Sequence, residues 1–229
     1  MEVTQKTKAI ILKREAFNES NSRVFVYTQD FGKLDLVARG TQKISSKLAG
    51  HIEPLNLCEI MIIKGKQYDY LGSAVSENVF INIKNDYEKC IISGEVAQAV
   101  DQVIKGREKD EQIFLMLHRF LEVLNNCGDN ILECRLQTIQ SAFILKLISM
   151  LGYQPDLDNF KACLPASQEL QRGEPVGKVG NILASKNVIN IMKFALENRF
   201  EDIVQADFIT ELVKEFEQVV KQYKQYIFD

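Results

Sequence analysis

The hydrophobic period of this chain changes once, near residue 80, and that change constrains the fold more than any other feature. From Thr7 to about Phe80 the apolar runs are short and rich in β-branched and aromatic residues, which is typical of strands. Beyond Phe80 the period becomes helical, as in SKNVINIMKFALENRF, where one helix face holds Val188, Ile191, Met192, Ala195 and Leu196. Strands followed by helices predict an α+β chain with two domains, residues 1–80 and 81–229.

The first part holds five segments that we expect to be strands: TKAIILK, SRVFVYT, KLDLVAR, LCEIMIIK and QYDYLGSAV. In the third of them, Leu34, Leu36 and Ala38 are expected to share one face. A long connection over residues 40–56 separates the third segment from the fourth. Five strands with one long connection are too few for a sandwich and favour a small, partly open barrel of the OB type.

The helical hydrophobic period of residues 81–229 predicts an all-α domain of about five helices. The stretch 131–151 is apolar almost all round in its second half, which indicates a helix at the centre of a bundle. Other helices are expected around residues 88–105 and 110–125 and towards the end of the chain. Residues 154–181 contain three of the four prolines and three glycines, and are predicted to form a long loop excursion.

Composition indicates a cytoplasmic protein with no membrane partner. No run reaches the ~18 uncharged apolar residues of a spanning helix. The apolar stretch 9–12 before Lys13 and Arg14 is too short for a secretory signal. Five cysteines, odd in number and with no C-x-x-C pair, fit reduced thiols better than a disulfide framework.

Positive charge is concentrated near the start of the chain, although the formal net charge is −3. Residues 1–80 hold 11 Lys and Arg against 9 Asp and Glu, or +2, whereas residues 81–229 hold 17 against 22, or −5. Basic grooves with interleaved aromatics on OB barrels are typical of single-strand nucleic-acid binding. The aromatics at hand are Phe17, Phe25, Tyr27, Phe31, Tyr68 and Tyr70. A solvated basic face without a ligand remains the alternative.

Three segments resemble the RecO recombination-mediator family. GKLDLVARGTQKISSKLAGHIEP, residues 32–54, is similar to a family motif with a glycine-lysine turn, an alanine-arginine-glycine triplet and a leucine-alanine-glycine-histidine-x-glutamate-proline run. AIILKREAFNESNSRVFVYTQDFG resembles the family's first hairpin, including Arg23 before the second strand. LGYQPDLD, residues 151–158, resembles the segment at the end of the family's central helix. Order and spacing agree over nearly the whole chain.

The resemblance implies a DNA repair protein that binds single- and double-stranded DNA and anneals complementary strands. It implies that the protein helps to load recombinase onto DNA coated by single-strand-binding protein, with RecR as a partner, at the nucleoid. The acidic, apolar C-terminal tail of single-strand-binding protein would dock on the helical domain. The DNA-binding residues that we infer are, in order, Arg39, Lys33, Lys43, Lys47, Arg23, Lys13 and Arg14.

Arg39 is placed first because it matches the family motif and because a guanidinium fork suits phosphate oxygens. His51 and Glu53 also match the family run. We interpret them as structural residues that hold the long connection, since no nucleophile–base pair accompanies them.

The chain departs from the family pattern after PDLD. Many RecO relatives carry a zinc finger there, built from two C-x-x-C pairs. Here the first pair would fall at Phe160 and Cys163, and the second pair is absent. One cysteine cannot supply the roughly four ligands of a structural zinc, so we expect no metal and no other cofactor.

No catalytic constellation is visible in the sequence, and the chain is predicted not to be an enzyme. GEPVGKVG contains a glycine-lysine pair, but Val179 stands where a phosphate-binding loop requires Ser or Thr. Strand annealing would then depend on charge neutralisation and proximity. The alternative function is a protein-interaction scaffold with an OB barrel whose DNA binding is weak or lost.

Overall fold

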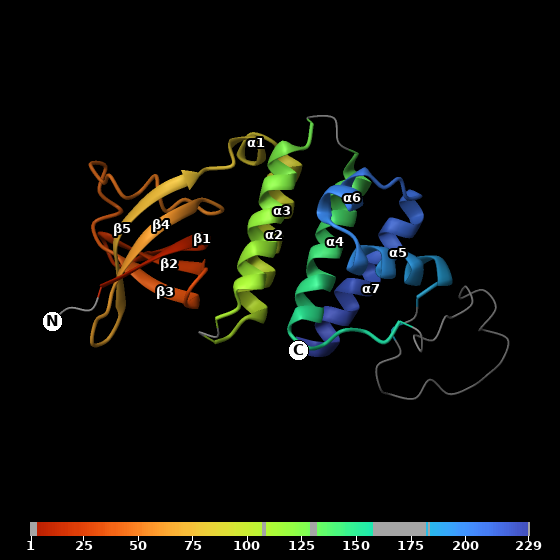
Figure 1. The fold of residues 1–229 in the computed structure, drawn as a ribbon. Helices are drawn as coiled ribbons and strands as arrows, with labels where there is room; N and C mark the ends of the chain where they lie inside the picture. Colours follow the sequence, from red (N-terminus) through yellow and green to blue (C-terminus); the bar gives the residue numbers. More distant parts are fainter. Residues whose placement is uncertain (1–3, 107–108, 129–131, 158–181, 183, 229) are drawn as a thin grey trace. The chain divides into compact units, whose positions relative to one another are not determined.

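The computed structural model describes residues 4–106, 109–128, 132–157, 182 and 184–228. The described chain consists of five strands followed by seven helices (Figure 1). By packing it divides into two compact units, Met1–Cys127 and Gly128–Asp229. Strands give way to helices near residue 80, as the period indicates, but the first three helices pack with the barrel in the first unit.

The strands form the five-stranded barrel that the sequence predicts. They are β1 (Thr4–Phe17), β2 (Asn21–Thr28), β3 (Gly32–Ala38), β4 (Leu57–Ile63) and β5 (Asp69–Asn78). The barrel closes in the order β1-β2-β3-β5-β4. All neighbours are antiparallel except β3 and β5, which pair in parallel over three residue pairs. This closure leaves no open sheet edge and confirms the OB-type architecture.

Alternate residues of each strand fill the barrel. In β3 the inward residues are Leu34, Leu36 and Ala38, as expected from the sequence. They pack with apolar residues of the other strands, including Ala9, Ile11, Val24, Val26, Ile60, Ile62 and Leu71. The outward positions of β1 to β3 face away from this core; Arg23 and Asp35 are partly exposed there, whereas Ile10 and Tyr27 are buried.

A β-bulge in β1 decides which way its last residues point. The register shifts between Ile11, which faces Val26, and Lys13, which faces Phe25. An extra residue in one strand reverses the alternation that follows it. Lys13, which would otherwise follow Ile11 into the core, points outward. Arg14 lies opposite the core residue Val24 and points to the inner side.

Helices α1 (Ile81–Lys84), α2 (Tyr87–Val103) and α3 (Glu111–Asn126) complete the first unit, and α2 packs against β1. They cover one end of the outer barrel surface. Tyr27 is buried there and its hydroxyl donates to the carbonyl of Asp110 at 3.1 Å. Burial raises the pKa of Tyr27 to about 12.

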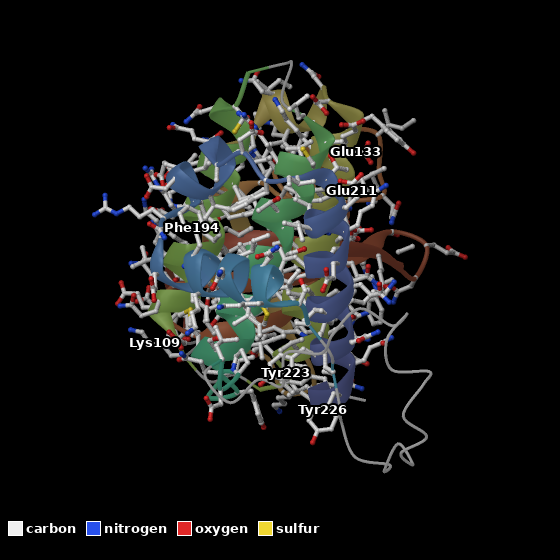
Figure 2. The ribbon with its side chains drawn as sticks, turned by 90° about the vertical axis from the view of Figure 1, so that its right-hand side faces the viewer. Lys109, Glu133, Phe194, Glu211, Tyr223 and Tyr226 are labelled. Carbon is white, nitrogen blue, oxygen red and sulfur yellow. The ribbon has the colours of Figure 1, made fainter. Side chains whose placement is uncertain are left out.

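The second unit is a helical bundle around α4 (Glu133–Met150), with α5 (Lys186–Glu197), α6 (Phe200–Gln205) and α7 (Thr210–Phe228). Ten residues of α4 are buried, and the helix packs against the other three, as its all-round apolar sequence predicts. Phe143 of α4 stacks on Phe200 of α6, with ring centroids 6.1 Å apart. Figure 2 labels Phe194 on α5 and Tyr223 and Tyr226 on α7. The predicted excursion, with Phe160 and Cys163, falls mostly within residues 158–181, outside the described residues.

No helix in the described part of the chain has the length and apolarity needed to cross a membrane.

Candidate nucleic-acid interface

The seven predicted DNA-binding residues divide into two groups in the structure. Four of them have partners within the protein: Lys13, Arg14, Arg23 and Lys33. The other three, Arg39, Lys43 and Lys47, are exposed. No ion pair is found for these three among the residues that the structure describes. The positive charge available to a ligand therefore lies at the end of β3 and in the connection 40–56.

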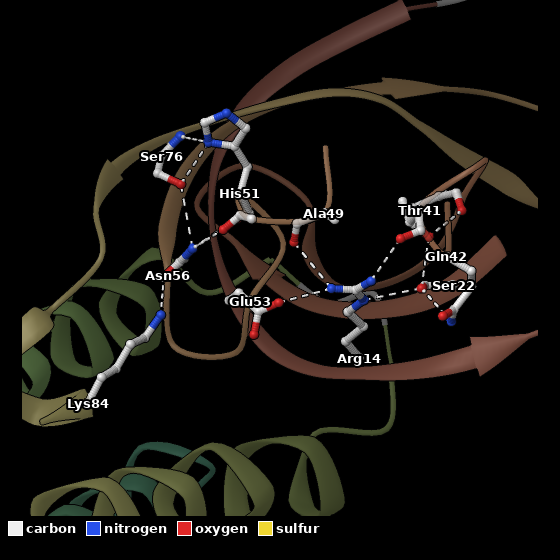
Figure 3. Close-up of polar contacts among 12 residues, drawn as sticks. Arg14, Ser22, Thr41, Gln42, Ala49, His51, Glu53, Asn56, Ser76 and Lys84 are labelled. Carbon is white, nitrogen blue, oxygen red and sulfur yellow. Dashed lines mark hydrogen bonds and ion pairs between the residues drawn. The ribbon is translucent and has the colours of Figure 1, made fainter. Parts of the chain in front are cut away.

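Arg14 binds the protein itself (Figure 3). Its Nε donates to Ser22 Oγ at 3.1 Å, and its two terminal nitrogens donate to the carbonyls of Thr41 at 3.1 Å and Ala49 at 3.2 Å. It also pairs with the Glu53 carboxylate at 3.0 Å. Only 19% of the side chain is exposed. Arg14 therefore fastens the connection 40–56 to β1.

The Lys33 ammonium group also has its partners within the protein. Its Nζ pairs with Asp101 at 2.7 Å and donates to the carbonyls of Asp101 and of Ile104, the latter at 3.0 Å. The side chain is 19% exposed. Lys33 thus joins β3 to the end of α2, which the sequence could not indicate because the partner is about 70 residues away.

Arg23 and Lys13 lie on the open part of the outer barrel surface, beside Phe25. The Arg23 Nε is 2.8 Å from each Asp35 oxygen, and its guanidinium lies 5.3 Å from the Phe25 ring centroid. Lys13 pairs with Glu15, and its Nζ lies 5.6 Å from the same ring. The hydrogen bonds that Arg23 donates to Asp35 and Lys13 donates to Glu15 raise the pKa values of the two cations. Both cations are partly neutralised but remain at the surface.

Arg39 stacks on an aromatic ring instead of pairing with a carboxylate. Its Cζ is 4.1 Å from the centroid of Tyr70 in β5, a cation–π contact that orders the side chain without neutralising it. Tyr68 lies edge-on to Phe17, with centroids 5.6 Å apart. Arg39 is therefore held in place with its charge available.

Together these residues form one surface, which we call the cation–aromatic face: Lys13, Phe17, Arg23, Phe25, Arg39, Tyr68 and Tyr70. Strand pairing sets much of it, because Arg23 lies opposite Val37 and Val37 opposite Tyr70, so all three point the same way. Tyr68 is close enough to Arg23 to contribute to its pKa. Two of the six expected aromatics are elsewhere: Tyr27 is buried, and Phe31 packs against the barrel core.

The start of the connection 40–56 is fixed to the β1–β2 hairpin. Gly40, with φ of 69°, donates its N–H to Asn21 Oδ1 at 2.9 Å. The N–H of Gln42 donates to the carbonyl of Ser20 at 3.0 Å, and the buried Thr41 hydroxyl bonds to Ser22 at 2.8 Å. The positive φ explains why glycine follows Arg39.

The end of the connection is fixed by Asn56, whose side-chain amide donates to the carbonyls of Gly50 and His51 at 3.1 Å each (Figure 3). Lys84 of α1 donates to the Asn56 Oδ1 at 2.5 Å, and burial lowers the pKa of Lys84. His51 Nδ1 accepts the Ser76 N–H at 3.2 Å, which places the ring proton on Nε2. His51 and Glu53 both hold the connection, as the sequence analysis interprets them.

Between these anchors, residues 43–47 form an exposed turn that we call the loop tip. The N–H of Ser46 donates to the carbonyl of Lys43 at 2.9 Å and closes the turn. Lys43 and Lys47 are exposed at its two ends. The loop tip is thus a basic projection carried by a well-anchored connection.

Lys66, in the β4–β5 connection, is an exposed cation that the sequence analysis missed. It follows Gly65, where a Cβ would lie 2.1 Å from the Tyr68 carbonyl oxygen and 2.9 Å from the Tyr70 ring. Only glycine permits this close approach, so Gly65 helps to position both tyrosines. The sequence did contain a signal for it, because Lys66 stands between Gly65 and the tyrosine-containing stretch QYDY, residues 67–70.

Within the described residues, no group of three His, Cys, Asp or Glu side chains is placed to hold a metal. The family's zinc-finger position lies outside those residues. Cys58 is buried and its Sγ donates to the His51 carbonyl at 3.0 Å; burial raises its pKa to about 11. It is a core thiol rather than a nucleophile.

The second unit contains a shallow apolar pocket of about 360 Å³, lined by Asn187, Asn190, Ile191, Phe194, Phe208 and Leu212. Lys146 does not line this pocket. Its Nζ donates to the Leu196 carbonyl at 2.9 Å and lies 5.9 Å from the Phe200 ring centroid. Burial lowers the pKa of Lys146. An acidic peptide tail would need a basic rim, and Lys146 does not provide one here.

Comparison with known proteins covers almost the whole chain. The family described as "Recombination protein O N terminal" matches residues 1–80, and "Recombination protein O C terminal" matches residues 84–227. DNA repair protein RecO of Thermoanaerobacter sp. is 28% identical over 69% of this chain and 62% of its own length. The corresponding proteins of Alkaliphilus metalliredigens and Dehalococcoides mccartyi are 22% and 23% identical over 94% of this chain, covering 84% and 87% of their lengths.

The match to the Thermoanaerobacter protein, and to that of Caldanaerobacter subterraneus, spans less than two thirds of those relatives. The two family descriptions, in contrast, follow each other along the chain with a gap of three residues. Barrel, helical region and sequence match thus agree, and the chain belongs to the RecO family of DNA repair proteins.

Proposed function

We propose that this protein is a DNA-binding recombination mediator. It binds single- and double-stranded DNA, anneals complementary strands and helps to load recombinase onto DNA coated by single-strand-binding protein, acting with RecR. The observation that carries the proposal is the exposed Arg39 stacked on the ring of Tyr70, followed along the chain by the exposed Lys43 and Lys47 of the loop tip. With DNA as its ligand, the protein would act in the cytoplasm, at the nucleoid.

The chemistry of the site suits single-stranded DNA. Arg39, Lys43 and Lys47 would contact phosphates and displace condensed counterions, because none of them is paired with a carboxylate of the described residues. Phe17, Phe25, Tyr68 and Tyr70 offer ring surface on which unpaired bases stack. Arg23 and Lys13 would add less, since each shares its charge with a carboxylate. We assign Arg14 and Lys33 to structural roles, because most of their donors already have acceptors.

The proposed annealing involves no covalent chemistry. Neutralising phosphates on two strands reduces their repulsion, and holding them on one surface raises their effective concentration. We therefore assign no enzymatic activity to the protein, which is also the expectation from its sequence. The roles of RecR and of the single-strand-binding protein tail rest on family membership.

Salt titration of oligonucleotide binding tests the proposal. For single strands, the logarithm of the association constant falls with the logarithm of salt concentration by ~0.7 per neutralised phosphate. Three phosphate contacts from Arg39, Lys43 and Lys47 predict a slope of about −2 or steeper. Annealing of complementary oligonucleotides coated with single-strand-binding protein should accompany this binding.

A protein-interaction scaffold is the second candidate, and one observation favours it. Four of the seven predicted DNA-binding cations already have carboxylate partners, which lowers the positive field of the barrel. Oligonucleotide binding that is absent, or insensitive to salt, would support the scaffold over the mediator.

A further inference from the structure

Ile44, in the loop tip, is an isoleucine with no packing partner among the residues that the structure describes. Its relative exposure is 108%, more than the side chain has in a reference peptide. The hydrogen bond from the Ser46 N–H to the Lys43 carbonyl makes Ile44 the second residue of a four-residue turn, where it is open to solvent. A single exposed apolar residue is common on protein surfaces, so its surroundings must decide whether it has a role.

The surroundings of Ile44 are basic and held in place. Residues 41–52 contain Lys43 and Lys47 but no Asp or Glu. On one side the chain is bonded to the β1–β2 hairpin through Gly40 and Gln42. On the other side Leu48 packs against the barrel core and the Ala49 carbonyl accepts from Arg14. The isoleucine is therefore presented between two cations at a defined place.

We propose that Ile44 is an apolar wedge that inserts between neighbouring bases where single- and double-stranded DNA meet. This inference rests on the proposed DNA-binding function. Proteins that unstack DNA insert side chains of this kind between base steps while cations hold the flanking phosphates. The absence of acidic residues from 41–52 favours a polyanion over a protein as the ligand of this tip.

The wedge has a role distinct from that of the phosphate contacts. Insertion separates two stacked bases and leaves their pairing edges accessible, which assists the start of annealing with a second strand. Because Ile44 carries no charge, it contributes to affinity without changing the number of counterions released. Replacing Ile44 should therefore lower the affinity alone, whereas replacing Lys43 or Lys47 should lower both the affinity and the salt slope.

The test uses the full chain and a forked DNA with 2-aminopurine at the junction, whose fluorescence rises when the base is unstacked. The variants are Ile44→Ser, which removes the wedge, and Ile44→Met, which retains an apolar side chain. Ile209→Ser is the matched control, an exposed isoleucine at the start of α7. Since Ile44 is fully exposed, Ile44→Ser should leave the thermal midpoint unchanged.

Wild type, Ile44→Met and Ile209→Ser are expected to raise the fluorescence on binding. Ile44→Ser should lose most of that rise and bind the fork about five- to tenfold more weakly, with the same salt slope. Steep salt-dependent binding with an unchanged 2-aminopurine signal in Ile44→Ser would overturn the wedge alone. Loss of RecR binding in Ile44→Ser, with fork binding intact, would make the tip a protein contact. Failure of wild type to bind any oligonucleotide would overturn the wedge and the DNA-binding function together.

Discussion

Replacing Arg14 by methionine is expected to loosen the connection 40–56 without removing a phosphate contact. Methionine keeps the apolar stem of the side chain but has none of the donors that reach Ser22, Thr41, Ala49 and Glu53. The loop tip would remain in the chain with both of its lysines. Only the support under it would be lost.

The magnitude follows from the contacts of Arg14. Three hydrogen bonds to neutral acceptors contribute a net ~1 kcal/mol each. The pair with Glu53 adds ~0.5 kcal/mol or less, because that carboxylate is half exposed. We therefore expect Arg14→Met to lower the free energy of unfolding by about 3 kcal/mol, since part of the loss is recovered by water at the freed carbonyls. Arg14→Lys keeps one cation near Glu53 and should cost about 2 kcal/mol.

The assay combines urea denaturation, limited proteolysis and salt-dependent DNA binding. Both variants should unfold at lower urea, and cleavage within residues 40–56 should be faster in Arg14→Met. DNA affinity should fall several-fold because the loop tip must be ordered on binding, while the salt slope stays that of wild type. If Arg14 instead contacts phosphate, stability and cleavage will be unchanged and the slope will be shallower by about 0.7.

Four other predictions concern single residues of the first unit. Arg39→Ala should weaken single-strand binding and make its salt slope shallower by about 0.7. Arg23→Ala, which frees Asp35, should change the slope by less. Equal effects of the two variants in a fluorescence-anisotropy titration would contradict the assignment of Arg39 as the stronger phosphate contact. Tyr70→Leu should reduce affinity for single strands by roughly tenfold and affinity for duplex much less, as measured by competition between the two DNAs, because only unpaired bases stack on the ring. Cys58, with a pKa raised to about 11, should resist alkylation at pH 8 while exposed Cys90 reacts, and peptide mass spectrometry showing rapid labelling of Cys58 would refute its burial. Because folding favours the neutral thiol of Cys58, its contribution to stability should be present below pH 9 and be lost as pH rises towards 11.

The barrel was predictable because the alternation of apolar and polar residues within each strand already shows which side chains face inward. Alternation in β3 places Leu34, Leu36 and Ala38 inside, and the structure agrees. The all-round apolar sequence of α4 likewise predicts a central helix. In both cases the residues that decide the outcome lie within one element.

The interface was less predictable because pairing across elements decides it. Nothing near Arg14 in the sequence shows that the β1 bulge leaves it facing inward, since the bulge is defined by the register against β2. Lys33 is neutralised by a helix end reached 68 residues later. For Arg39, Lys43 and Lys47 the sequence shows that residues 40–52 contain no acid, but only the structure shows that they have no ion-pair partner among the described residues.

The salt slope of single-strand binding, measured for the triple variant Arg39→Ala, Lys43→Ala and Lys47→Ala, tests the proposed interface most directly. The control is Lys6→Ala with Lys8→Ala, two barrel cations that pair with Glu59 and Glu77 and are not members of the cation–aromatic face. We expect the triple variant to lose about 2 from the wild-type slope and most of its annealing activity, and the control to lose little of either. A triple variant that binds and anneals DNA with the wild-type slope would contradict the interface.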